Sequence, residues 1–179
     1  AYKDKIEPLT KEIKENVKRI SKKLNEDGFR VIAVCTKNDI ERKIDYTIDD
    51  EKNMTLVGFI GFLDPPKESA KEAITKLNKA GIRVIVLTGD NSDVARCICK
   101  KVGINSKNIV IGSQIDKLSD SALVRILRAT NIFAKLSPIQ KARIVRVLKD
   151  SGNIVGYMGD GINDSPSLTN SDVGISVDT

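Results

Sequence analysis

Apolar positions along the chain follow two patterns, a helical stripe and a short continuous run. A stripe such as Ile13, Val17, Ile20 and Leu24 predicts an amphipathic helix, and Val/Ile-rich runs bounded by glycine, proline or polar residues predict strands. The expected helices are one starting after Thr10 and ending near Gly28, then 67–80, about 92–102, about 119–129, 138–150 and a short one after Asp164. The expected strands are 29–35, 54–62, 82–87, 108–112, 132–136, 153–158 and 173–177.

The order of these elements predicts the fold class. After residue 66, apolar strands alternate with amphipathic helices, which is typical of an α/β fold with a parallel sheet covered by helices on both faces. Sheets of this kind bind ligands beyond the carboxyl ends of their strands. The earlier part has one helix, two strands and a polar loop over 37–53. We therefore expect a smaller lobe over 1–62 and a three-layer domain over 67–179.

The stretch 63–66, Leu-Asp-Pro-Pro, separates the two parts. Its two prolines fix the backbone φ angle twice and remove two N–H donors, and each disfavours helix in the residue before it. A segment with these properties continues neither a helix nor a central strand. We place a domain hinge there.

Composition narrows the possible functions. Hydrophobic residues make up 40% of the 179 residues and charged residues 30%, which is typical of a soluble globular protein. No run approaches the roughly 18 apolar residues of a membrane helix, and no signal peptide is expected at the start. Only 4% of residues are aromatic, so we expect no nucleic-acid partner. The net charge of +6 suits a phosphate-bearing small molecule.

Two residue types limit the chemistry further. Three cysteines without zinc-ligand spacing favour a reducing, cytosolic compartment. The chain contains no histidine, which excludes Ser-His-Asp and Cys-His catalysis and argues against a zinc hydrolase. Catalysis by this chain must therefore use carboxylates, lysines, hydroxyls and a metal ion.

Polar residues that suit phosphate follow one predicted strand. Thr88, Gly89 and Asp90 come directly after 82–87 and before a helix, where a hydroxyl and backbone N–H groups can hold a phosphate oxygen. An alternative is that Asp90 or Asn91 only caps the helix that follows. A second candidate is Lys141, one turn into the helix that starts at Pro138, where its ammonium can neutralise a phosphoryl group; the alternative is a solvated lysine.

The stretch YMGDGINDSP, residues 157–166, gives the third candidate. Gly159 and Gly161 allow a tight turn after a strand, so that Asp160 and Asp164 can face one point. Two carboxylates suit a hard cation such as Mg²⁺, and Asn163 can orient a ligand or a metal-bound water. The alternative is a turn in which Asp164 caps the next helix. Taken together, the three segments predict a magnesium-dependent phosphoryl-transfer site.

The stretches LDPP, LTGDN, FAKLSPIQKARIV and GDGINDSPSL resemble, in this order, the cytosolic signatures of P-type cation-transporting ATPases. The resemblance is close over about 58–179 and implies a haloacid-dehalogenase-like phosphorylation domain, whereas 1–57 looks like the last part of a nucleotide-binding domain. GFIGFLDPPKE and SDVGISVDT look most like the magnesium-transporting members. The implied cofactor is Mg²⁺ and the implied substrate is ATP. The parent protein is expected in the cell membrane, with this soluble part on its cytoplasmic side.

The resemblance also assigns roles to single residues. Asp160 and Asp164 are expected to be metal ligands, with Asn163 completing their loop. Thr88, Gly89 and Asp90 are expected to contact the phosphoryl group, and Lys141 to neutralise it. Arg30 is expected to reach the nucleotide from the other lobe. Lys135 stands where calcium-pump relatives commonly have arginine, so that its charge remains without bidentate hydrogen bonding.

One departure from the family pattern concerns the nucleophile. The family forms an aspartyl-phosphate on the aspartate of a D-K-T-G-T motif, and this motif is not in the sequence. The chain therefore resembles a piece of a pump. Its expected partners are the upstream nucleophile strand, the rest of the nucleotide-binding domain, the actuator domain and the membrane helices. Since the missing strand is central in the family's sheet, we expect a second copy or a rearranged element to cover its place.

Two other functions stay open on the sequence. One is a freestanding phosphatase of the haloacid-dehalogenase-like fold, which needs an early nucleophilic aspartate. Asp4, Asp27 and Asp39 all lack a buried strand before them. The other is a non-catalytic module of this fold that acts by binding, although Lys141 and the Asp160/Asp164 pair favour a phosphoryl-transfer site.

Overall fold

The structure, a computed structural model, describes residues 6–38, 44–160 and 164–177. It divides into two compact units, Ala1–Asp64 (unit 1) and Pro65–Thr179 (unit 2). The boundary falls inside the 63–66 segment. Bending at this segment stays a prediction.

Unit 1 is a helix and a hairpin. Its elements are α1 (Lys11–Glu26), β1 (Phe29–Thr36), the 3₁₀ helix η1 (Ile48–Asp50) and β2 (Thr55–Leu63). Thr10 caps α1, because its side chain accepts a hydrogen bond from the Ile13 N–H at 3.3 Å. Gly28 follows the helix with a φ of 96°, a left-handed conformation that favours glycine. β1 and β2 pair antiparallel, from Phe29 opposite Leu63 to Thr36 opposite Thr55.

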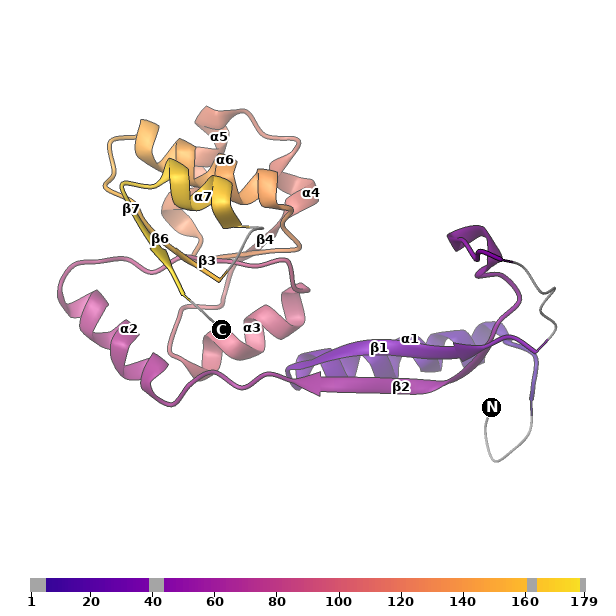
Figure 1. The fold of residues 1–179 in the computed structure, drawn as a ribbon. Coiled ribbons are helices and arrows are strands. Elements are labelled where there is room, and N and C mark those ends of the chain that lie inside the picture. The colour runs from indigo at the N-terminus through magenta and orange to yellow at the C-terminus, as the bar shows by residue number, and fades with distance from the viewer. Residues whose placement is uncertain (1–5, 39–43, 161–163, 178–179) are drawn as a thin grey trace. The chain divides into compact units, whose positions relative to one another are not determined.

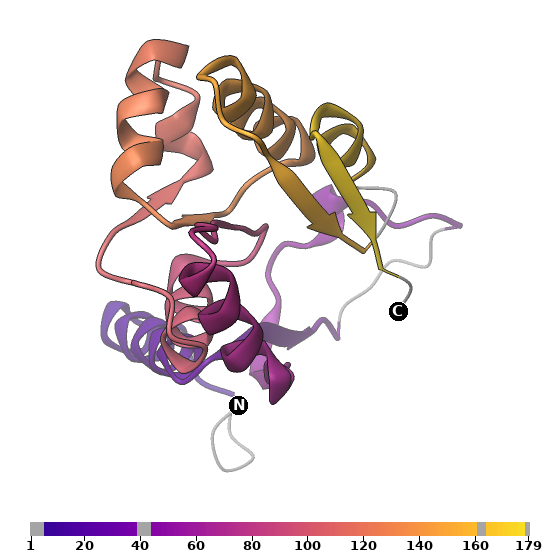
Figure 2. The same cartoon turned by 90° about the vertical axis from the view of Figure 1, so that its left-hand side faces the viewer.

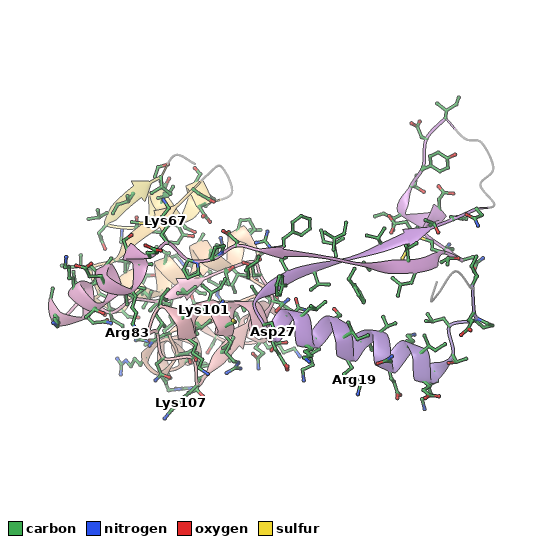
Figure 3. All side chains as sticks on the ribbon, turned by 90° about the horizontal axis from the view of Figure 1, so that it is seen from below. Arg19, Asp27, Lys67, Arg83, Lys101 and Lys107 are labelled. Atoms are coloured by element: carbon green, nitrogen blue, oxygen red, sulfur yellow. The ribbon has the colours of Figure 1, made fainter. Side chains whose placement is uncertain are left out.

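One face of this hairpin packs against α1. Figure 3 shows α1 running along the strands, with Arg19 on the side of the helix away from them. The expected stripe is right for Ile13, Val17 and Leu24, which are half-buried, and wrong for Ile20, which is exposed. On the hairpin face that includes the paired residues Ile32 and Ile60, these side chains are 53% and 50% exposed. That face therefore carries exposed apolar side chains, together with the exposed Arg30, which pairs with Phe62.

Unit 2 contains two parallel sheets. The first has the order β3–β5–β4 and the second pairs β6 with β7. Figure 1 shows helices on both sides of these strands. The elements of unit 2 are α2 (Ser69–Lys79), β3 (Val86–Leu87), α3 (Ser92–Lys101), β4 (Ile109–Ile111), α4 (Gly112–Ile115), α5 (Asp120–Ala129), β5 (Ile132–Ala134), α6 (Pro138–Asp150), β6 (Gly156–Gly159), α7 (Ser165–Asn170) and β7 (Val173–Ser176).

The three-layer α/β architecture is confirmed by how β5 packs. Phe133 is fully buried against α4, α5 and α6 on one face of the sheet. Its neighbours Ile132 and Ala134 are buried in a second cluster on the other face, with α3 residues such as Cys99. This alternation follows from the strand period of two. The same division is visible in Figure 2, where α3 and α5 lie on opposite sides of β5.

Five of the expected strands, 82–87, 108–112, 132–136, 153–158 and 173–177, are shorter in the structure, and the first and fourth of these begin several residues late. Only Val86 and Leu87 of 82–87 are paired, because β5 begins at Ile132, the partner of Val86. β6 begins at Gly156, opposite Val173, rather than at residue 153. Strand length therefore depends on the partner strand, which the apolar runs alone do not specify.

The two sheets leave open strand edges. Within the described residues β3 pairs only with β5 and β6 only with β7, so each keeps one unpaired edge. In the described part of the chain no further strand pairs with these edges, and the rearranged element expected from the sequence stays a prediction. The other expected cover, a second copy, also stays a prediction. Side chains join α6 to the second sheet through the ion pair between Lys149 and Asp172, 3.2 Å apart.

Candidate functional site

Lys141 and Asp164 form a largely buried ion pair. Ser137 caps α6, and Pro138 occupies its first turn, so that Lys141 lies near the start of the helix. Lys141 Nζ lies 2.8 Å from Asp164 Oδ1, and the two side chains are 16% and 10% exposed. The interpretation of Lys141 as a solvated lysine is therefore wrong. Asp164 occupies the N-cap position of α7, as the alternative interpretation expected, but its side chain makes no capping hydrogen bond there.

Tyr157 contacts the same carboxylate oxygen. Its hydroxyl donates to Asp164 Oδ1 at 3.0 Å, and both residues are buried. Burial alone raises the pKa of Asp164, but the hydrogen bonds from Lys141 and Tyr157 outweigh it and hold the pKa below its usual value. Burial, followed by the bond to Asp164, raises the pKa of Tyr157 to about 12. Tyr157 was not among the expected site residues, because a single tyrosine in a predicted strand indicates only burial.

Gly159 provides the space for Asp164. A Cβ at position 159 would lie 2.6 Å from Asp164 Oδ2 and 2.7 Å from its Cβ, closer than real Cβ contacts. Gly159 is not among the described glycines with positive φ. The glycine is needed here because the carboxylate lies directly against the backbone, which adds a reason to the tight turn expected from the sequence.

Thr88 and Asp90 form hydrogen bonds with each other within the turn after β3. Thr88 Oγ1 accepts a hydrogen bond from the Asp90 N–H at 3.1 Å and donates to Asp90 Oδ2 at 3.0 Å. The capping role belongs to Asn91, whose side chain accepts from the N–H groups of Asp93 and Val94, each at 3.0 Å. Gly89 is exposed, and a Cβ there would make only an ordinary 3.5 Å contact with the Leu136 carbonyl.

The end of β5 holds the Thr88 turn by its backbone. The Lys135 N–H donates to the Asp90 carbonyl at 2.8 Å, and the Leu136 N–H donates to the Thr88 carbonyl at 3.0 Å. Lys135 has a φ of 52°, a left-handed conformation that is strained for lysine, and its side chain is exposed. Gly112, another residue that the sequence analysis missed, packs so closely that a Cβ would lie 2.5 Å from the Lys135 carbonyl.

These contacts form two groups of the expected site residues. Lys141 and Asp164 are joined by side chains, and an Asp160 backbone hydrogen bond reaches the Asp164 carboxylate. Thr88, Asp90 and Lys135 form the second group at the carboxyl ends of β3 and β5. Arg30 lies on β1 in unit 1. Asn163 lies outside the described residues.

The donor chemistry of the first group fits Mg²⁺. Asp160 follows β6 and is exposed, and Asp164 lies over Gly159. Magnesium keeps several water ligands and is commonly bound by one or two carboxylates plus substrate phosphate oxygens. Two aspartates are therefore sufficient, and the described residues hold no cluster of three or more His, Cys, Asp or Glu side chains arranged for a metal.

Comparison with known protein families shows which family this chain belongs to. Residues 37–172 match the profile of the haloacid dehalogenase-like hydrolases. The chain belongs to the haloacid dehalogenase-like family. Residues 1–69 of this haloacid dehalogenase-like chain also match the cytoplasmic domain N of P-type ATPases. No helix in the described part of the chain has the length and apolar character of a membrane span.

The relatives of this haloacid dehalogenase-like chain are cation pumps by name. It is 47% identical over 173 residues to "Magnesium-transporting ATPase, P-type 1" of Salmonella typhimurium, with 97% of the chain and 19% of the relative covered. The Escherichia coli K12 protein of the same name has the same identity and coverage. "Calcium-transporting ATPase 1" of Bacillus cereus is 38% identical over 176 residues, or 97% of the chain and 20% of the relative. The resemblance to P-type ATPases is confirmed, and the chain spans about a fifth of these relatives.

Proposed function

We propose that this chain supplies the metal- and phosphate-holding part of the phosphoryl-transfer site of an ATP-driven cation pump. The observation that carries the proposal is the buried pair of Lys141 and Asp164 over Gly159, next to Asp160. Burying a carboxylate and an ammonium group costs desolvation free energy, and buried charged groups of this kind are common at functional sites. A site for Mg²⁺ and phosphate would use both charges. The parent protein lies in the cell membrane, with this part on the cytoplasmic side and ATP as its substrate.

Each residue has a role in this proposal. Asp160 and Asp164 hold the magnesium ion, which neutralises charge on the phosphoryl oxygens when bound. Lys141 offsets the remaining negative charge, and the Thr88 hydroxyl and Gly89 N–H orient the phosphoryl group. The remaining assignments are Asp90, which holds the Thr88 turn, Asn163, which completes the metal loop, and Arg30 and Lys135, which contact the nucleotide.

The charge distribution supports an anionic ligand in unit 2. Unit 1 has 13 basic and 13 acidic residues, so that its formal net charge is zero. Unit 2 has 17 basic and 11 acidic residues and therefore carries the whole net charge of +6. A net positive unit raises the local concentration of a polyanion such as ATP.

The open edges of β3 and β6 support a nucleophile from outside this chain. One parallel strand placed between them would join the two sheets into one. The carboxyl end of such a strand would then lie with the Thr88 turn and the Asp160 loop, because parallel strands end at the same edge. An aspartate there is well placed to attack the phosphoryl group and form a covalent intermediate.

The proposal is tested with labelled ATP. The 179-residue chain is incubated with Mg²⁺ and γ-labelled ATP, quenched in acid, and assayed for hydroxylamine-sensitive label. We expect no label on the chain alone. A longer protein with the upstream segment restored is expected to carry label on that segment and to lose it on Asp160→Asn. A labile acyl-phosphate within the 179 residues contradicts the proposal.

The transported ion is proposed to be magnesium. The identity of 47% to the magnesium-transporting relative exceeds that of 38% to the calcium-transporting one. The test is uptake by vesicles that contain the complete pump, with Mg²⁺ and Ca²⁺ compared at equal concentration. Transport of Ca²⁺ alone contradicts this part of the proposal.

A further inference from the structure

The Asp164 carboxylate has two side-chain donors on one oxygen. Lys141 Nζ lies 2.8 Å and the Tyr157 hydroxyl 3.0 Å from Oδ1. In the proposed site Lys141 also has to neutralise a phosphoryl group, so an arriving phosphate draws its ammonium away from Asp164. A buried carboxylate that loses its donor is strongly destabilised. The second donor therefore determines how freely Lys141 can move.

The two donors differ in mobility. Lysine carries its ammonium on a flexible four-carbon chain, whereas a tyrosine hydroxyl is fixed to a rigid ring. Tyr157 lies on β6 opposite Gly174 of β7, and it is only 8% exposed. The Tyr157 hydroxyl cannot leave Asp164 without moving a buried ring, but Lys141 can leave by rotating its side chain.

We propose that Tyr157 is a positioning residue that keeps Asp164 hydrogen-bonded while Lys141 turns to the phosphoryl group. This inference rests on the proposed function of the site. Tyr157 touches neither metal nor phosphate and acts only through Asp164. It lowers the cost of releasing Lys141, because the buried carboxylate then keeps one donor instead of none.

A buried side-chain hydroxyl on α7 does not fill this role. Ser167 on α7 is 1% exposed, and among the described residues no hydrogen bond joins its Oγ to Asp164. Its hydroxyl therefore does not hold Asp164. The backbone bond from Asp160 holds the carboxylate as well, but it belongs to the loop that is proposed to bind the metal. Tyr157 is the side-chain donor that stays when Lys141 leaves.

The first test measures the binding of inorganic phosphate to the 179-residue chain in the presence of Mg²⁺. Phosphorus NMR of the phosphate reports the binding. Tyr157→Phe keeps the ring and removes the hydroxyl. We expect it to weaken phosphate binding about tenfold, which corresponds to about 1.4 kcal/mol. The matched control Tyr46→Phe, which removes a hydroxyl from unit 1, is expected to leave phosphate affinity unchanged. Equal affinity of Tyr157→Phe and the natural chain overturns the proposal.

The second test needs no ligand. Urea unfolding is measured for Lys141→Met in the natural chain and in Tyr157→Phe. We expect Lys141→Met to change the unfolding equilibrium constant about tenfold more in the Tyr157→Phe background, because Asp164 then has neither side-chain donor. Additive effects overturn the role of Tyr157. If the natural chain binds no phosphate with Mg²⁺, the proposed function fails, and this cycle alone decides the role of Tyr157.

Discussion

Replacing Gly159 by alanine should displace the Asp164 carboxylate. The new Cβ would stand 2.6 Å from Asp164 Oδ2 and 2.7 Å from Asp164 Cβ, so that one of the two residues has to move. Overpacking of this kind costs about 1–3 kcal/mol, and weakening a hydrogen bond to a charged group costs about 1.5–3 kcal/mol. Since the oxygen bonded by Lys141 and Tyr157 belongs to the displaced carboxylate, we expect a total loss of about 3 kcal/mol.

The assay is urea or thermal unfolding followed by circular dichroism. A loss of this size lowers the melting temperature by roughly 10 °C for a unit of this length. Gly156→Ala is the matched control, because it lies in the same strand and its Cβ would meet only the Val173 carbonyl at 3.9 Å. Adding Asp164→Gly should reduce the cost of Gly159→Ala, since it removes the atoms in the way. Equal stability of the two alanine variants refutes the reasoning.

Three further predictions concern single residues. Because the folded-state pKa of Asp164 is lowered, its stabilising effect is present above the unfolded-state pKa of about 3.9 and is lost as pH falls through the lower folded-state value. Urea midpoints at pH 7 and pH 3 should therefore differ less in Asp164→Asn than in the natural chain; an equal difference contradicts this. Burial raises the pKa of Cys99 to about 11, so iodoacetamide at pH 8 should modify it far more slowly than Cys97, as measured by mass spectrometry. Lys135→Gly should be about 1 kcal/mol more stable in urea than Lys135→Ala, because φ is 52° there; the reverse order contradicts the strain.

Local signals along the chain predicted much of the fold. Ser137 and Pro138 mark the start of α6, and the structure begins the helix at Pro138. Thr10 and Gly28 likewise bound α1. These features depend on residues within one turn of each other, so a sequence shows them directly. Strand lengths were less accurate at β3, because pairing depends on where β5 begins.

Part of the candidate site could also be predicted from local signals in the sequence. The order of Lys141 and Asp164 on successive elements of a parallel sheet was enough to expect them at one edge, and they form an ion pair. The bond from Tyr157 was not predictable, because its run of aliphatic neighbours indicates only a buried strand. The left-handed backbone of Lys135 leaves no signal in the sequence either. It arises where the end of β5 is fixed to the carbonyl groups of Thr88 and Asp90.

The division of unit 2 into two sheets has a mechanical consequence. Within the described residues no backbone ladder joins β3 to β6, and α6 reaches the second sheet through side chains, including ion pairs of Lys141 and Lys149. Side-chain contacts slide and re-form over short distances, whereas a ladder breaks bond by bond. A small shift of one sheet against the other therefore breaks no hydrogen bond of the described strand ladders. Salt should ease such a shift, because it screens the half-exposed ion pair of Lys149 and Asp172. Asp160 and the Thr88 turn follow strands of different sheets, β6 and β3, so that a shift between the sheets changes the distance between them.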